Sequence, residues 1–399
     1  MTRQPLILHG DAAFMADPFP SYATWRRRAP IHRAVTPNGS AAWLVTRYLD
    51  VRRCLVDPRL SLDKTNSRSG YRGLPLPPAL DANLLNMDPP QHSRVRRLVS
   101  TAFTPRRLRR LEPSIRRHTV DLLAAADTDG RIDIVGEFAF PLSLHVIATV
   151  LGVPQGALGA FQGWAEALFV PHSTDRFTVG QAVNQIDALV RALVNDARSR
   201  HATSLLGTLV TARDHGDRLS EDELTSLAFL LLLAGHETTA HLIGNAVLAL
   251  LERPHHLASL RARPGLLPVA VEEFLRFTGP NPYAIRRFAL DDVQIGVVRV
   301  PAGDTVLLGL ASAHRDPDAF EDPDTLRFDR TDNTHLAFGH GAHYCLGAAL
   351  ARTTIRTAIG ALIDRYPRIE LESAPGALQW RPSFRSRGLV RLPILVERH

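Results

Sequence analysis

The segment from Ser220 to Glu252 constrains the fold of this chain more than any other. Ser220 and Glu223 fit a capping box that starts a helix, and Pro254 ends it. At about 1.5 Å per residue, such a helix is close to 50 Å long and crosses a domain of this size. Its middle, residues 227–234, is apolar on every side, which predicts a helix buried in the core.

Polar residues follow this apolar run at once, as His236, Glu237, Thr238 and Thr239. The run is therefore too short for a membrane span, which needs about 20 apolar residues. Burying a carboxyl group and hydroxyls costs free energy unless they find partners. The cluster is thus either a hydrogen-bonded structural network or a functional site.

The rest of the chain is mostly helical in pattern, with two predicted strand pairs. Apolar runs at 31–35 and 42–46 flank Pro-Asn-Gly, which predicts a hairpin. The runs 293–300 and 305–310 flank Pro-Ala-Gly-Asp, which predicts a second strand pair around a turn. We therefore expect a mainly α protein with a smaller β-rich region, an α+β fold.

The chain reads as one domain over residues 1–399, since no flexible linker, fixed-period repeat or long block of like charge divides it. Its first 20 residues contain acidic residues and three prolines, unlike a signal peptide or a membrane anchor. Cys54 and Cys345 are the only cysteines, which excludes a disulfide framework of the secreted kind. We expect a cytoplasmic protein with reduced cysteines.

Positive charge is concentrated between Gln91 and His118, a stretch that contains nine arginines and only one acidic residue, Glu112. The stretch is either a solvated helix surface or a docking patch for an acidic partner. Nucleic acid is a weaker alternative, because the stretch lacks the series of aromatic residues on which bases stack.

A second unusual segment is Phe-Gly-His-Gly-Ala-His-Tyr-Cys-Leu-Gly at 338–347, before the helical pattern 348–363. Gly339 and Gly341 allow a tight backbone path, and Cys345 then stands at a helix start, where the dipole favours a thiolate. A metal ligand or a nucleophile fits this place. Zinc is disfavoured because no second cysteine is near, and covalent c-type haem because Cys-x-x-Cys-His is missing. The structural alternative is a core cysteine in a Gly-rich turn.

In this loop Phe338, Gly341, His343, Cys345 and Gly347 resemble the haem-binding loop of the cytochrome P450 family. The resemblance extends over nearly the whole chain, from Ala42 to Ile394. It implies a cytochrome P450 fold with a long central helix over a b-type haem (haem b). It also implies that Cys345 is the thiolate ligand of the iron, with Phe338 and Gly339 beside the haem.

The segment 234–239 resembles the helix of that family which passes over the haem. Ala234 and Gly235 would leave room there for dioxygen and substrate. The Thr238 hydroxyl would bond back to the Ala234 carbonyl and distort the helix. Glu237 and Thr238 resemble the acid–alcohol pair that delivers protons during dioxygen activation.

Further matches to the family concern the haem carboxylates and the fold around the cysteine loop. His92 and Arg96 share a helix face suited to a propionate, and Arg287 and His343 resemble further propionate contacts. Arg286 is the adjacent alternative to Arg287.

Glu273 and Arg276 resemble the Glu-x-x-Arg pair of the family, which an arginine of a later segment joins. We assign that third position to Arg327, in a role that stabilises the fold. Without the family, such a pair is usually a surface ion pair worth less than about 1 kcal/mol.

The resemblance implies a monooxygenase that inserts one atom of O2 into an organic substrate, by hydroxylation or epoxidation. Electrons would come from NAD(P)H through a separate ferredoxin or flavodoxin, because the chain has neither a dinucleotide motif nor cysteines for an iron–sulfur cluster. The acidic partner would dock on the basic 91–118 stretch. Alternatives are a peroxygenase or rearrangement enzyme of the same fold, a haem-based ligand sensor, and a nucleic-acid-binding protein.

The substrate is expected to meet the variable segments of the family. They are mostly apolar, which favours a hydrophobic small molecule of secondary or lipid metabolism, such as a terpenoid, steroid or polyketide. We place these segments at 71–85, 161–170, 230–235, 282–285 and Phe384.

Overall fold

The structure is a computed structural model that describes residues 4–8, 12–70, 73–74, 76–101, 103–169, 178–200, 204–214 and 219–398. Four residues of the expected substrate segments, namely Tyr71, Arg72, Pro75 and Val170, lie outside the described residues, as does Ala102 of the basic stretch.

Helices make up most of the described chain. They are α1 (Ala12–Ala16), α2 (Phe19–Arg28), α3 (Tyr48–Val56), α4 (Pro78–Asp81), α5 (Gln91–Ser100), α6 (Pro105–Ala126), α7 (Phe140–Leu151), α8 (Phe161–Phe169), α9 (Val179–Ser199), α10 (Leu205–Asp214), α11 (Glu221–Leu251), α12 (Pro254–Ala262), α13 (Leu267–Phe277), α14 (Leu310–Ala313) and α15 (Ala348–Arg365). A π-helical turn, η2 (Ile134–Ala139), leads into α7.

The strands are short and form three sheets. They are β1 (Leu6–Ile7), β2 (Ile31–Val35), β3 (Ala41–Val45), β4 (Leu60–Ser61), β5 (Arg131–Asp133), β6 (Arg287–Ala289), β7 (Val293–Ile295), β8 (Val298–Val300), β9 (Thr305–Leu308), β10 (Arg368–Leu371) and β11 (Pro393–Glu397). The largest sheet has the order β1-β2-β3-β9-β6-β4, and the smaller ones are β10-β11-β5 and the hairpin β7-β8.

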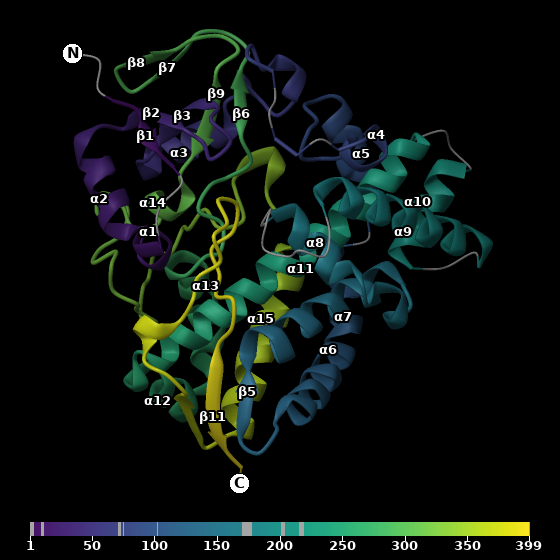
Figure 1. The fold of residues 1–399 in the computed structure, drawn as a ribbon, viewed down its shortest axis with the longest axis vertical. Coiled ribbons are helices and arrows are strands. Elements are labelled where there is room, and N and C mark those ends of the chain that lie inside the picture. Colours follow the sequence, from purple (N-terminus) through teal and green to yellow (C-terminus); the bar gives the residue numbers. More distant parts are fainter. Residues whose placement is uncertain are drawn as a thin grey trace.

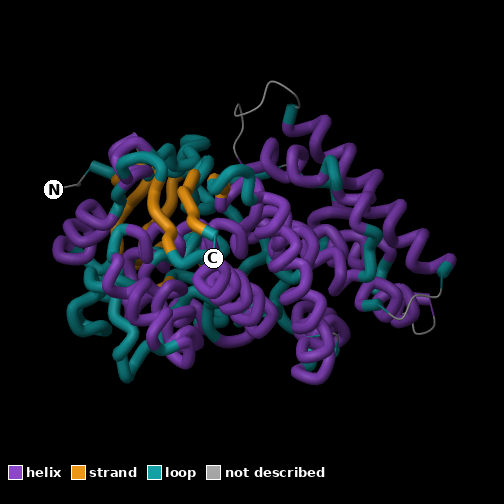
Figure 2. The backbone as a smooth tube through the Cα atoms, turned by 90° about the horizontal axis from the view of Figure 1, so that it is seen from below, coloured by secondary structure: helices purple, strands orange, loops and turns teal. Residues whose placement is uncertain are grey.

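The strands of the largest sheet gather at one side of the molecule, and helices fill the other side (Figures 1 and 2). The C-terminal strand β11 lies at the opposite end from β7 and β8, beside β5 (Figure 1). The predicted mainly α fold with a smaller β-rich region is confirmed.

Helix α11 is the central element, as the sequence predicts. The Ser220 hydroxyl accepts the Glu223 N–H at 3.0 Å and the Glu223 carboxylate accepts the Ser220 N–H at 2.9 Å, so the predicted capping box is present. Most of its residues are buried, and it packs against α4, α7, α9 and α15. The apolar stretch therefore forms the core around which the other helices assemble.

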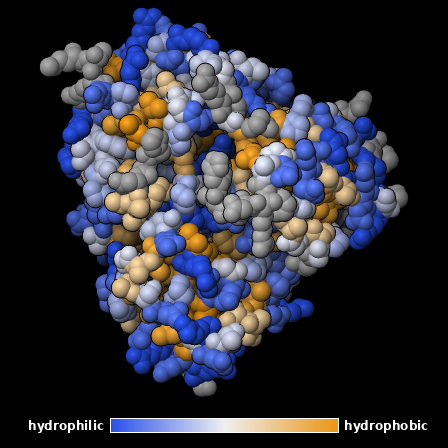
Figure 3. Space-filling model, in the orientation of Figure 1, coloured by the Kyte–Doolittle hydropathy of each residue, from blue (hydrophilic) through white to orange (hydrophobic). Residues whose placement is uncertain are grey.

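Two helical stretches are long and apolar enough to cross a membrane, namely Ile134–Leu151 and Glu221–Leu251. Most residues of both are buried inside the protein, which is the pattern of core helices. Hydrophobic side chains (orange) reach the surface only in separate places on the face shown in Figure 3, among hydrophilic ones (blue).

The first predicted hairpin is confirmed, because β2 pairs antiparallel with β3 and His32 lies opposite Leu44. The second predicted strand pair is wrong. Residues 293–300 contain two strands that pair with each other, because Gly296 adopts a φ of 58° and turns the chain between β7 and β8. Strand β9 instead joins β3 and β6 in the large sheet.

Candidate active site

A cavity of about 1210 Å³ lies between α11 and the cysteine loop. Its lining is mainly apolar and includes residues of α5, α11 and β6, residues 337–340 and 343–347, and the tail near 382–386. All the residues that the sequence proposed for the site line this cavity, namely His92, Arg96, Ala234, Gly235, Glu237, Thr238, Arg287, Phe338, Gly339, His343 and Cys345.

The cysteine loop has the tight backbone path that its glycines predict. Gly339 and Gly341 both have a φ of 75°, in the left-handed region that glycine adopts at low cost. A Cβ on Gly341 would lie 2.6 Å from a methyl group of Val56 on α3, so this glycine is also required by packing. The Cys345 N–H donates to the Phe338 carbonyl at 2.8 Å and closes the loop.

Cys345 is accessible from the cavity and precedes α15, whose N-cap is Gly347. Burial by the surrounding protein nevertheless raises the pKa of its thiol, against the lowering effects of the Gly347 N–H, Arg96 and Arg352. The backbone N–H that the sequence predicted for the sulfur is present, from Gly347, but burial outweighs its effect on the thiol. Cys345 stands three residues before the helix, so the dipole acts weakly there, and a bound metal cation would be what deprotonates it.

Cys54, by contrast, is buried in α3, and burial raises the pKa of its thiol to about 12. It does not line the cavity, so it remains an inert core residue.

Basic side chains cluster on one wall of the cavity. The rings of His92 and His343 lie 3.9 Å apart, and burial lowers the pKa of both, for His343 to about 3. His92 Nε2 and Arg287 Nη1 are buried and have no hydrogen-bond partner among the described residues. Asp88 is the acid acting on this group, and its carboxylate is bonded to Ser61 and to the Leu62 N–H. Orphaned donors around a cavity fit an anionic group.

Arg286 and Arg287 are distinguished by their partners. Arg286 donates to the Leu85 carbonyl at 3.2 Å and to Asn86 Oδ1 at 2.6 Å, so protein groups already engage it. The assignment of Arg287 rather than Arg286 to the anion site thus agrees with the geometry. Arg96 lies beside the site and donates to the Tyr344 carbonyl at 2.5 Å.

Helix α11 contributes Ala234 and Thr238 to the cavity lining. The Thr238 hydroxyl donates to the Ala234 carbonyl at 2.9 Å, as predicted. Ala234 is exposed to the cavity, whereas a Cβ on Gly235 would lie 3.0 Å from the Ile147 side chain on α7. The small residue at 234 therefore borders the open space, and the one at 235 is explained by helix packing.

Glu237 is buried, and its Oε1 accepts the Ser386 hydroxyl at 2.9 Å and lies 3.4 Å from His241 Nε2. Burial raises the pKa of Glu237, but the hydrogen bonds from His241 and Ser386 and the nearby charge of Arg381 act against it, and the pKa lies below its usual value. The carboxylate is therefore ionised near neutral pH and can accept a proton.

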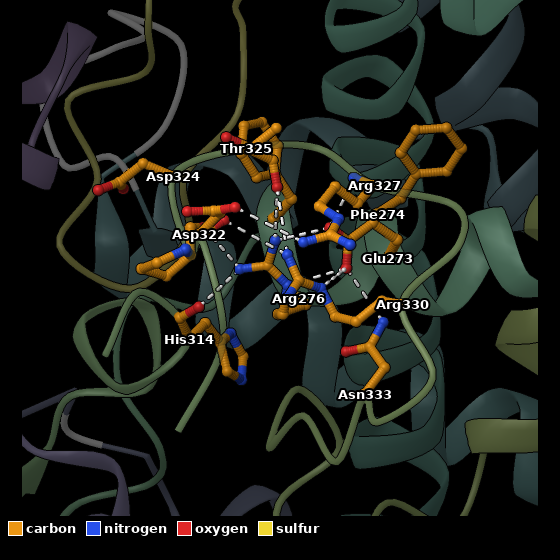
Figure 4. A network of polar contacts seen from close by, with 12 residues as sticks. Glu273, Phe274, Arg276, His314, Asp322, Asp324, Thr325, Arg327, Arg330 and Asn333 are labelled. Atoms are coloured by element: carbon orange, nitrogen blue, oxygen red, sulfur yellow. Dashed lines mark hydrogen bonds and ion pairs between the residues drawn. The ribbon is translucent and has the colours of Figure 1, made fainter. Parts of the chain in front are cut away.

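Glu273 anchors a second polar network (Figure 4). Arg276 Nη2 donates to Glu273 Oε1 at 2.6 Å and Arg276 Nε to Oε2 at 2.8 Å, and both side chains are almost fully buried. The pair is thus a core ion pair and not a surface one.

The assignment of Arg327 as third member of this network is wrong. Its guanidinium turns away to Glu321 and Asp329, and only its backbone N–H reaches Glu273, at 3.0 Å. Arg330 Nε lies 3.3 Å from Glu273 Oε2, with its side chain 6% exposed. Arg327 and Arg330 are three residues apart in a segment without regular structure, so no periodicity shows which side chain points inward.

Sequence reasoning also missed His241 and Ser386, the partners of Glu237. His241 is four residues after Glu237, and this i,i+4 spacing on a buried helix could have revealed it. Ser386 comes from the C-terminal tail, 149 residues away, and no local pattern indicates it.

The expected substrate segments partly agree with the cavity. Leu74, Leu84, Leu168, Leu230 and Phe384 are among their residues that line it. The whole turn 283–285 lines it as well, whereas Pro282 does not.

Comparisons with known proteins agree with this geometry. The sequence model described as Cytochrome P450 matches residues 144–263 and 265–392. The cytochrome P450 monooxygenase PikC of Streptomyces venezuelae is 43% identical over 385 residues, covering 96% of this chain and 91% of the relative. The 6-deoxyerythronolide B hydroxylase of Saccharopolyspora erythraea is 38% identical over 397 residues, covering 96% and 97%.

Among solved structures, the tirandamycin C-bound P450 monooxygenase TamI superposes with a TM-score of 0.92 at 40% identity, covering 98% of this chain and all of that one. The matches to these proteins cover nearly the whole chain. The chain therefore belongs to the cytochrome P450 family and is a haem-dependent monooxygenase of that family.

Proposed function

We propose that this enzyme hydroxylates or epoxidises a hydrophobic small molecule of secondary metabolism, of the size of a macrolide or another polyketide. The observation that carries the proposal is one cavity that is lined both by Cys345 and by the Ala234–Thr238 turn of α11. At about 1210 Å³ it exceeds the roughly 300–1,000 Å³ of an ordinary ligand pocket, so a prosthetic group and a sizeable substrate can share it.

The names of similar proteins support this substrate class. They include the mycinamicin IV hydroxylase/epoxidase of Micromonospora griseorubida and the vitamin D(3) 25-hydroxylase of Pseudonocardia autotrophica. A peroxygenase or rearrangement enzyme needs no proton delivery during dioxygen activation, and the cavity-facing Glu237 and Thr238 favour a monooxygenase over it.

The residues of the site fit haem b. Cys345 would be its thiolate ligand, and Phe338 and Gly339 belong to the loop that carries this ligand. His92, Arg96, Arg287 and His343 would bind the propionates, and two of their nitrogens, His92 Nε2 and Arg287 Nη1, are buried without a partner among the described residues. When bound, the haem supplies the reductive cleavage of dioxygen and the transfer of one oxygen atom to carbon. The protein excludes water from the apolar cavity. Glu237 and Thr238 would transfer protons into this cavity.

Incubation with candidate macrolactones, ¹⁸O2 and a ferredoxin–reductase pair tests the proposal. We expect one ¹⁸O atom in the product and a thiolate-type red-shifted band in the reduced carbonyl complex. Cys345→Ser should abolish both, whereas the matched Cys54→Ser should keep both. Retention of the band in Cys345→Ser, or its loss in Cys54→Ser, would show that the ligand assignment is wrong.

We further propose that an acidic ferredoxin or flavodoxin, reduced by NAD(P)H, docks on the basic stretch 91–118. Helix α6 packs against α15, which follows Cys345, and Arg356 of α15 bonds Glu112 of α6 at 2.9 Å. Arg106, Arg109 and Arg110 of α6 are exposed, whereas Arg94 is already paired with Glu223. Positive charge at this place would steer an acidic partner toward the cysteine side of the cavity.

Reversal of Arg106 and Arg109 to glutamate should slow first-electron transfer, more at low ionic strength than at high, because salt screens the attraction. Substrate binding, measured by the spin-state change, should stay the same. Equal rates for both proteins at every ionic strength would show that the basic stretch is only a solvated surface.

We also propose that residues 1–399 form one domain and that the enzyme acts in the cytoplasm.

A further inference from the structure

Glu237 belongs to a largely buried polar cluster built from three segments that are far apart in the sequence. Helix α11 contributes Glu237 and His241, α8 contributes Glu166, and the tail contributes Arg381 and Ser386. Arg381 lies 3.2 Å from Glu166, so its charge is already paired. The His241 side chain is 0% exposed, and its ring meets Phe140 of α7 edge-on.

The two oxygens of Glu237 differ in their surroundings. Both the Ser386 hydroxyl and His241 Nε2 approach Oε1, at 2.9 and 3.4 Å. Oε2 has no hydrogen bond to any residue in the described part of the chain, and Glu237 lines the cavity. One oxygen is therefore held by the protein, and the other is available to the cavity.

The ring of His241 is suited to donate a hydrogen bond and not to carry a charge. Burial lowers its pKa, with Arg381 acting in the same direction and Glu237 and Glu166 against it. Nδ1 is buried without a partner among the described residues, so a proton there would be left unbonded. The single proton of the neutral ring then belongs on Nε2, facing Glu237. Gly388 makes room for the ring, since a Cβ there would lie 2.0 Å from Nδ1.

We propose that His241 is a positioning residue that, together with Ser386, anchors Oε1 of Glu237 and thereby keeps Oε2 directed to the cavity for proton transfer. The proposal rests on the monooxygenase function proposed above. Other charged and titratable groups near His241 are Arg381 and Glu166, which neutralise each other, and His236, whose pKa burial lowers to about 4. His236 is therefore neutral near pH 7 as well.

A pair of substitutions tests the anchor. His241→Gln places an amide N–H near the position of Nε2 without a titratable group, and His241→Leu removes the donor. In the leucine variant we expect product per NAD(P)H to fall about tenfold and hydrogen peroxide to rise, because a misplaced group loses the geometry that transfer requires. The glutamine variant should recover most of the coupling, and His255→Leu on the surface of α12 should behave as wild type.

A readout that needs no turnover separates this proposal from the proposed function. Infrared difference spectra of the oxidised holoenzyme, recorded against pH and assigned with Glu237→Gln, report the Glu237 carboxyl. Its pKa should rise in His241→Leu and in Ser386→Ala, and stay near the wild-type value in His241→Gln. The proposed anchoring role is refuted if the Glu237 pKa is unchanged in both His241→Leu and Ser386→Ala. It is also refuted if His241→Gln and His241→Leu form the same amount of product per NAD(P)H. If wild type forms no product with any substrate but the infrared shifts appear, only the proposed function fails.

Discussion

The two glutamates Glu237 and Glu273 are both buried, on helices α11 and α13 that pack together, yet their carboxylates differ in what remains free. Both oxygens of Glu273 are occupied, by Arg276, by Asn333 Nδ2 at 3.1 Å, by the Arg327 N–H and by Arg330. Only Oε1 of Glu237 is occupied, by uncharged donors.

The difference separates a carboxylate that holds the fold from one that can react. A fully bonded ion pair away from the cavity has no capacity to exchange protons, and removing one partner leaves an uncompensated buried charge. A carboxylate with one free oxygen at a cavity can still accept and pass on a proton there. Its loss leaves no unpaired charge behind, because the nearby Arg381 is paired with Glu166. The number and the charge of the hydrogen-bonding partners of each carboxylate therefore distinguish the structural role of Glu273 from the reactive role of Glu237. Burial alone does not distinguish them.

The largest expected effect is that of Glu273→Gln. It leaves Arg276 and Arg330 without a counter-charge in the core and should lower the free energy of unfolding by about 3–5 kcal/mol, with loss of bound haem. The matched Glu237→Gln should lower it by less than about 1 kcal/mol, since the amide oxygen still accepts from Ser386. Urea unfolding of both variants measures this, and equal destabilisation would remove the distinction.

The next effect concerns proton delivery at the cavity. Thr238→Ala should keep haem and substrate binding but divert electrons to peroxide, with product per NAD(P)H roughly tenfold lower. This is less than the roughly 10²-fold of a lost proton donor, because Glu237 remains. Thr225→Ala is the matched control, since its hydroxyl makes the same backbone bond to Glu221 at 2.9 Å and does not line the cavity. Unchanged coupling in Thr238→Ala would contradict the role.

A smaller effect compares the two arginines near Glu273. Arg330→Gln should cost about 1–3 kcal/mol of unfolding free energy, because it removes a buried charged partner. Arg327→Gln should cost clearly less than Arg330→Gln, because the Arg327 side chain is 29% exposed and pairs with exposed acids. Thermal and urea unfolding report both; the reverse order would restore Arg327 as the third member of the network.

The smallest effect concerns the neighbouring Glu272, which lies between Arg352 and His335. Burial raises its pKa, but the hydrogen bonds from His335 and Arg352 and their charges lower it to about 2. A lowered folded pKa adds stability above the ordinary value, and this stability is lost as pH falls toward about 2. Glu272→Gln should therefore flatten the acid side of the stability–pH curve between about 4.5 and 2. An unchanged slope there would show that Glu272 is not the group responsible.

The sequence predicted the elements that local chemistry determines. The capping box of α11, its buried middle and the β2–β3 hairpin depend on residues within a few positions of each other. The second strand pair was mispredicted because the turn at Gly296 lies inside one apolar run, where periodicity does not reveal a break.

Site residues could be predicted where they belong to a short motif with a characteristic spacing. Cys345, Thr238 and the basic residues each belong to a short segment whose spacing indicates its role. Arg330 and Ser386 were missed because their contacts join segments 57 and 149 residues apart, and the direction of a side chain in an irregular segment depends on what packs against it.

The bond from Arg96 to the Tyr344 carbonyl connects α5 to the residue before Cys345. A protein bound on the arginine-rich surface that changes the position of α5 would also change the strain on the cysteine loop. By thermodynamic reciprocity, occupancy of the cavity must then alter the affinity for that partner by the same factor. Titrating the partner against the enzyme with and without a cavity ligand would measure this coupling, and Arg96→Ala, which removes the connection, should reduce it.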